Sequence, residues 1–280
     1  MILKGLSARL SILSARLYAY VYLRGFKVWT TYKTQIALNV LSWVLPVFTY
    51  YFTGTALGAR IVRGMGISPQ AYTPFVVIGL AFQGYVSSVV TTISQRLRNE
   101  QLMGTIEYYL LTQSGILGML VYSSLWGFVM NSISMAVTLA IGYALGVRYV
   151  ASGALAAVLV TAELLLATLG LSMLAGGIVM ITKQGNPISF FFSVVTQLVA
   201  GTVFPVTVLP AWARLLSYSV PLTLALQALR LSMLQGYGVL GISSYELELL
   251  VYDVVLLPLG VLVYRYGFDR ARKEGTLSEY

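Results

Sequence analysis

The 280-residue sequence predicts an all-α integral membrane protein with six transmembrane helices, an N-terminal amphipathic in-plane helix and an outer re-entrant helical segment after the fifth span. Composition is the first reason: 58% of the residues are hydrophobic and 10% are charged, whereas a soluble domain carries roughly 25% charged residues. The second reason is that uncharged runs reach the length of about 20 residues that a helical span needs. The third is that Lys and Arg gather in short segments beside these runs, as the positive-inside rule describes.

Residues 1–33 form the first unit, which we expect on the cytoplasmic side. Leu6, Leu10, Leu13 and Leu17 make one apolar stripe at helical spacing, with basic residues along its edge. This pattern favours an amphipathic helix lying in the plane of the membrane over a poorly ordered basic tail. No uncharged run here is long enough for the apolar core of a signal peptide followed by a cleavage site, so we expect none.

The transmembrane domain is expected at residues 34–266, followed by a cytoplasmic tail at 267–280. Pro46 should kink the first span, and a G-x-x-x-G motif at Gly142 and Gly146 permits close helix packing at the end of the third. The expected spans lie within residues 34–57, 72–94, 115–146, 150–182, 188–204 and 249–264.

Residues 206–245 are ambiguous, because prolines interrupt them and Arg230 lies inside their longest apolar run. With six spans, both termini are cytoplasmic and that side collects thirteen of the eighteen Lys and Arg residues. A seventh span would place the basic C-terminal tail outside, against the charge bias. We therefore interpret this region as a re-entrant or surface-lying segment on the outer side, where broken backbone must pack on protein or line a wet cavity.

Several chemistries are excluded by composition. The sequence contains no Cys and no His, which rules out disulfides, Ser-His and Cys-His nucleophile pairs and typical zinc sites. It also lacks a G-x-x-x-x-G-K-(S/T) motif, so the chain has no nucleotide-hydrolysing P-loop of its own. The net charge of +9 flanks apolar runs, which indicates a membrane protein and not a nucleic-acid binder.

The polar stretch at about residues 99–112 lies between the second and third spans. Drawn as a helix, it places Leu102, Ile106, Tyr109 and Leu110 on one face. Its other face carries two carboxylates around a glycine, which lets a partner approach the backbone closely. The alternative is an ordinary amphipathic loop at the membrane interface.

Three blocks of the sequence resemble the type-2 ATP-binding-cassette exporter permeases. The polar stretch E-Q-L-M-G-T-I-E-Y-Y-L-L-T-Q-S is similar to that family's E-x-x-x-G-T-(L/I)-E-x-L-L-x-T-P signature, with Gln113 where the family has Pro. A second block, A-G-T-V-F-P-V-T-V-L-P-A-W followed by S-V-P-L-T and Arg230, resembles the family's F-P-x-x-x-L-P and P-(L/F)-T region. The third is the C-terminal A-R-K-E-G-T-L-S-E-Y, similar to the family's short tail.

The resemblance implies a permease subunit that pairs with a second copy or a paralogue and with two cytoplasmic ATPase subunits. ATP and magnesium would be bound by those partners, and this chain itself would hold no cofactor and no metal. It also implies a multi-pass protein of the cell membrane, which we expect to be a prokaryotic plasma membrane. Relatives of this class move drugs, lipids, polysaccharides or ions, and the spans do not discriminate among these cargoes.

The resemblance further implies roles for two groups of residues. The coupling helix that docks in the ATPase would carry Glu100, Gly104, Thr105 and Glu107. The outer re-entrant gate would be shaped by Phe204, Pro205, Pro210 and Pro221.

Glu163 and Asp253 are acidic residues inside expected spans. A charge at the bilayer centre costs about 2.5–3.5 kcal/mol on insertion scales, so each side chain should face the bundle, find a partner or stay protonated. They are candidates for the translocation path, and the alternative is a structural hydrogen bond between spans. An ion-coupled secondary transporter that uses these two acids is the alternative function.

Overall fold

The computed structural model describes residues 18–64, 66–102, 115–182, 190 and 194–274. Within this part of the chain every regular element is a helix, which confirms the predicted all-α class. The longer helices are α3 (Lys33–Gly64), α4 (Pro69–Leu102), α6 (Gly115–Ala144), α7 (Ala154–Thr182) and α11 (Ser243–Lys273). The shorter ones are η1 (Tyr18–Lys27), α2 (Val28–Thr31), η2 (Ala151–Gly153), η3 (Val206–Val208), α9 (Ala211–Tyr218), α10 (Pro221–Gln235) and η4 (Val239–Ile242).

Four helical stretches among the described residues are long and apolar enough to cross a bilayer. They are Lys33–Ala56, Leu125–Ala144, Ala151–Thr182 and Val239–Lys273. The predicted second span falls inside α4, whose 34 residues extend over about 51 Å at 1.5 Å per residue. Much of the predicted fifth span, and the leucine stripe predicted at residues 6–17, lie outside the described residues.

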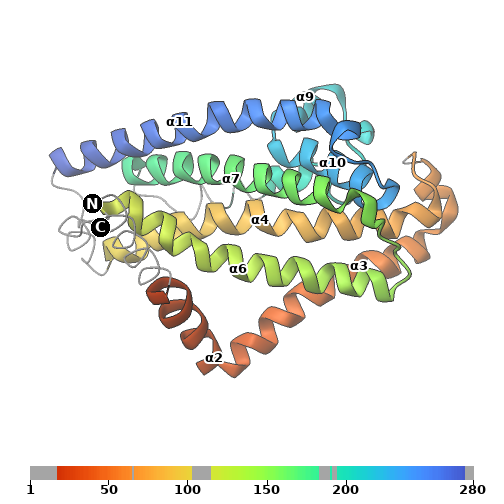
Figure 1. The fold of residues 1–280 in the computed structure, drawn as a ribbon, viewed down its shortest axis with the longest axis horizontal. Helices are drawn as coiled ribbons and strands as arrows, with labels where there is room; N and C mark the ends of the chain where they lie inside the picture. The colour runs from red at the N-terminus through yellow and green to blue at the C-terminus, as the bar shows by residue number, and fades with distance from the viewer. Residues whose placement is uncertain (1–17, 65, 103–114, 183–189, 191–193, 275–280) are drawn as a thin grey trace, which may run out of the picture.

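Helices α4, α6, α7 and α11 run side by side along the molecule (Figure 1). One end of this bundle holds the last turns of α4 and α11 and the first turn of α6 (Figure 1), and we call it the proximal end. The opposite, distal end holds α9 and α10. Helix α3 joins the bundle near the distal end and diverges from it toward α2, so that its first half is largely exposed (Figure 1).

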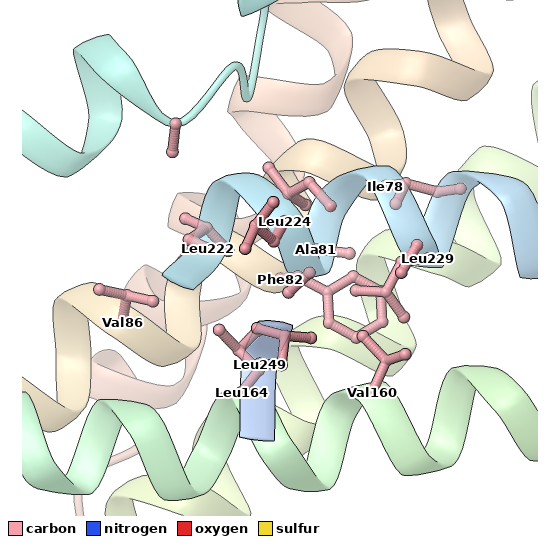
Figure 2. Close-up of a cluster of buried hydrophobic side chains, with 14 of the residues drawn as sticks. Ile78, Ala81, Phe82, Val86, Val160, Leu164, Leu222, Leu224, Leu229 and Leu249 are labelled. Carbon is pink, nitrogen blue, oxygen red and sulfur yellow. The ribbon is translucent and has the colours of Figure 1, made fainter. Parts of the chain in front are cut away.

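The main core lies where α10 crosses α4 and α7 near the distal end. Leu222 and Leu229 of α10, Phe82 of α4 and Leu164 of α7 are almost completely buried there (Figure 2). Pro221 opens α10 in its first turn, where a missing N–H removes no helical hydrogen bond. Gly236 ends the helix in the left-handed region, with φ of 75°.

Helices α7 and α11 approach closely because glycines face each other along both of them. A Cβ at Gly177 would lie 2.7 Å from the Val263 carbonyl oxygen, and one at Gly267 would overlap the Gly177 carbonyl. Two turns earlier, Gly170 and Gly260 repeat the arrangement. Small residues at such seams let the backbones of membrane helices make extensive van der Waals contact.

We expect Gly177→Leu to destabilise the protein strongly, because a side chain there must push α7 away from α11. Overpacking of this kind costs about 1–3 kcal/mol, which should lower the thermal unfolding midpoint measured in neutral detergent. Gly64→Leu is the matched control, since a Cβ at Gly64 meets nothing within 4 Å. Equal midpoints for the two variants would contradict the close α7–α11 packing.

Candidate functional site

A cavity of ≈520 Å³ lies among α3, α4, α6 and residue 197, and we call it the polar cavity. It is lined by hydroxyl and amide side chains together with a few apolar ones, and no charged residue is among the described residues that line it. The polar lining consists of Ser42, Thr49, Tyr50, Gln83, Ser87, Ser134, Thr138 and Gln197. Uncharged donors and acceptors of this kind can replace the hydration shell of a neutral polar solute.

Each long helix contributes its polar residues at helical spacing, so that they share one face. Gln83 and Ser87 are one turn apart on α4, and Ser134 and Thr138 are one turn apart on α6. Thr138 is 3% exposed. Burying a hydroxyl in an apolar bundle costs free energy unless the hydroxyl makes a hydrogen bond. The sequence does not predict this site, because isolated Ser, Thr and Gln residues hardly lower the hydropathy of a span.

Pro46 contributes to the wall of the cavity on α3. Because proline has no N–H, it cannot bond the carbonyl of Ser42 one turn earlier, and both residues line the cavity. Helix α3 packs on the bundle just beyond this point, where Val47 is buried against Val77 and Val147. The proline therefore lies where the packed and exposed halves of α3 meet.

The predicted gate residues all lie in the segment that links residue 199 to α10, at the distal end (Figure 1). Pro205 precedes η3, Pro210 is the N-cap of α9, and Pro221 is the first residue of α10. Phe204 lies in the turn before Pro205. The prolines thus start short helices, as their fixed φ favours.

Arg230 of α10 fixes this segment to α4. Its Nε and Nη2 donate to the Phe75 carbonyl at 3.3 and 3.1 Å, and Nη2 also donates to the carbonyls of Gly201 at 2.9 Å and Thr202 at 3.2 Å. Its guanidinium carbon lies 3.4 Å from the centre of the Phe75 ring. The turn itself lies directly on α4, since a Cβ at Gly79 would overlap the Thr202 carbonyl.

Three further side chains donate hydrogen bonds within the segment itself. The Ser217 hydroxyl donates to the carbonyl of Val199, and the Thr223 hydroxyl donates to the carbonyl of Ser217 at 2.6 Å. Arg214 donates to the Thr207 carbonyl at 2.8 Å. The short helices are therefore held by side chains that satisfy the carbonyls of the irregular backbone.

Glu163 on α7 lies within electrostatic range of Glu246 and Asp253 on α11. Asp253 is 5% exposed, and neither of its oxygens has a hydrogen-bond partner within the described residues. Neither Glu163 nor Asp253 is among the residues that line the polar cavity. The geometry groups these acids at the α7–α11 seam and separates them from the cavity.

The predicted coupling residues lie at or beyond the proximal end of α4. Glu100 belongs to α4, which continues unbroken to Leu102, whereas Gly104, Thr105 and Glu107 lie outside the described residues. The end of α4 and the start of α6, between which this stretch falls in the sequence, are at the opposite end of the bundle from α9 and α10 (Figure 1).

We expect Asp253→Val to raise the thermal unfolding midpoint in detergent. A buried polar group without a partner costs about 1–3 kcal/mol, and the substitution removes that cost. Glu248→Val, which removes an exposed acid of the same helix, should leave the midpoint nearly unchanged. A clear loss of stability in Asp253→Val alone would mean that this carboxyl group makes a stabilising contact.

Comparison with known proteins agrees with this arrangement. The family described as ABC-2 type transporter matches residues 18–234, which is most of the chain, and so confirms the resemblance found in the sequence. No curated protein matches the sequence. The matched region contains α3, α4, α6, α7 and the segment held by Arg230. The chain therefore belongs to the ABC-2 type transporter family, as a multi-pass membrane permease subunit that lacks a nucleotide-binding motif.

Proposed function

We propose that this permease exports its cargo by alternating access, through the polar cavity, with energy from a separate ATPase. The observation that carries the proposal is the continuity of α4. This one helix supplies the Phe75 carbonyl to Arg230, lines the cavity with Gln83 and Ser87, and continues to Leu102 beside the predicted coupling stretch.

A rigid helix of this length can convert a push at one end into a change at the other. Force applied near Glu100 would tilt α4, and so move the wall of the polar cavity and the distal segment together. ATP binding can drive such a change only if the two ATPase subunits contact the two states differently. ATP and magnesium would bind in those subunits, and the coupling contacts would come from Glu100, Gly104, Thr105 and Glu107.

The assembly that fits this mechanism is two permeases and two ATPase subunits. The proximal end would face the cytoplasm together with both termini, and the distal end would face outward. Phe204, Pro205, Pro210 and Pro221 would then shape a re-entrant outer gate, and six spans would cross the cell membrane. The concentration of Lys and Arg in the segments expected at the proximal end supports this orientation.

The alternative is an ion-coupled secondary transporter, and one observation favours it: Glu163 and Asp253 are close together inside the bundle. Its weakness is that neither acid lines the polar cavity. Proton-coupled transport would stop when the proton gradient collapses and continue when ATP is depleted, and ATP-driven export would show the reverse. This comparison decides between the two mechanisms.

The polar cavity can be tested without knowing the cargo, because the chain contains no cysteine. We expect Ser134→Cys to react with a hydrophilic methanethiosulfonate reagent, at a rate that changes when the complex binds ATP. Ser172→Cys is the control, because Ser172 is fully buried in α7 and outside the cavity. Labelling at position 172 requires the packing around α7 to open locally. Each increment of about 1.4 kcal/mol in the free energy of that opening slows labelling about tenfold. Equal, slow labelling at both positions would contradict a water-filled pathway.

The coupling stretch can be tested with the same reporter. In the complex reconstituted with its ATPase, we expect Glu107→Lys to abolish the ATP-dependent change in Ser134→Cys labelling, because charge reversal disrupts docking. ATP hydrolysis should persist in the ATPase subunits, and the permease alone should hydrolyse none. Glu248→Lys reverses an exposed acid on α11, near the distal end, and should leave the change intact. A normal response in Glu107→Lys would refute the docking assignment.

A further inference from the structure

A second cavity, of ≈300 Å³, lies at the distal end between α4, the turn at residues 200–207, α10 and α11. We call it the arginine pocket. Its lining includes Phe75, Pro205, Tyr218, Gln227, Arg230 and Tyr245. It shares no lining residue with the polar cavity, so what it binds does not depend on the identity of the cargo.

The charge of Arg230 is not balanced within the described residues. Its Nε and Nη2 groups are bonded to backbone carbonyls, which are dipoles and carry no net charge. No carboxylate within the described part of the chain lies at ion-pair distance from it. Arg230 is half-buried, and removing an unpaired cation from water is costly, so this position favours an anion that the described residues do not provide.

One side of the guanidinium remains available to such an anion. Nη1 makes no hydrogen bond with the described residues, and it is not shut off from the pocket that Arg230 lines. The carbonyls of Phe75, Gly201 and Thr202 hold the rest of the group in one orientation. The free N–H groups are thus presented by a fixed scaffold, which reduces the entropy lost on binding.

The rest of the lining supplies neutral donors and no acid. The Gln227 amide and the hydroxyls of Tyr218 and Tyr245 make no hydrogen bond with other described residues. Guanidinium, amide and phenol donors around one small cavity match the oxygens of a phosphate group. The chemistry therefore favours an anion with several oxygens over a cation or an apolar ligand.

The surroundings of the pocket indicate the source of the phosphate. Trp212 and Leu215 of α9 are 70% and 75% exposed, and Tyr218, on the same helix, reaches the pocket. Short helices with exposed aromatic and apolar residues lie at the headgroup level of a membrane. A phospholipid can place its phosphate in the pocket while its chains cover the apolar side of α9.

We propose that the arginine pocket is a binding site for the headgroup phosphate of an anionic phospholipid, which completes the link between α10 and α4. Arg230 provides the charge, and Gln227, Tyr218 and Tyr245 provide the remaining donors. The lipid is a structural ligand of the distal segment and differs from the transported cargo.

The test is the thermal unfolding midpoint of the purified full-length protein in neutral detergent, titrated with dioleoyl phosphatidylglycerol. The lipid should raise the midpoint saturably, because a ligand that binds only the folded state stabilises it. Dioleoylglycerol, which has the same chains and no phosphate, should raise it little. Inorganic phosphate should compete with the lipid and give a smaller shift. A full shift with phosphate alone, or an equal shift with dioleoylglycerol, would overturn the lipid assignment.

Substitutions in the arginine pocket provide a second test of the lipid site. Gln227→Leu removes one donor without touching the carbonyl contacts of Arg230, and should weaken phosphatidylglycerol binding about tenfold, the effect of one lost charge-assisted bond. Arg230→Lys should weaken it further, if the variant folds. Arg148→Gln removes an exposed charge near the distal end, outside the pocket, and should bind normally. Unchanged binding in Gln227→Leu, or equal loss in Arg148→Gln, would refute the site.

Discussion

The contact between Arg230 and three backbone carbonyls joins parts of the chain that are far apart in sequence. It connects α10 to Phe75 at the distal part of α4 and to the turn at Gly201 and Thr202. Arginine suits this position because its planar fork directs several donors at once, whereas lysine would offer a single point charge. Together with the hydrogen bonds of Ser217, Thr223 and Arg214, this contact satisfies the carbonyls of the irregular backbone and holds the distal segment in place. The distal segment, the arginine pocket and the distal part of α4 are therefore joined through the Arg230 side chain.

The remaining helices differ in how closely they pack: α7 and α11 pack closely together, whereas α3 packs loosely on the bundle. Among the described helices, α7 and α11 share the most extensive interface, and Gly170 and Gly177 bring their two backbones into contact. By contrast, α3 packs on the bundle through its second half, and Leu38, Leu41 and Leu45 of its first half are exposed. The polar cavity is lined by α3, α4 and α6 and by no described residue of α7 or α11. Movement of the loosely packed α3 can therefore change the shape of the cavity while the α7–α11 pair stays fixed.

The sequence predicted the helical class, and through prolines and charge bias it indicated a re-entrant or surface-lying helical segment at residues 206–245. In that range the structure has the short helices η3, α9, α10 and η4. Long apolar runs and helix breakers are local signals, so both could be read directly. It did not predict the polar cavity, because Gln83, Ser134 and Thr138 become one site only when separate helices are packed together. The G-x-x-x-G motif at Gly142 and Gly146 indicates close helix packing, and Gly142 does pack against Val77 of α4. Gly146 instead has a φ of 95° and serves to end α6. A spacing rule cannot distinguish a packing glycine from a terminating one, because the difference lies in the backbone angle.

The separation of charge in this bundle bears on how transport is driven. The lining of the polar cavity is neutral, Arg230 is held in a separate pocket, and Glu163 and Asp253 lie at the α7–α11 seam. In the proposed mechanism the polar cavity is the cargo site, and an ion-coupled carrier would need its acids to respond to the state of that site. Neither Glu163 nor Asp253 lines the cavity, and no charged residue is among the described residues that do. The energy for reorienting the cavity would then enter elsewhere, and the helix that leaves the cavity wall and continues to the proximal end is α4.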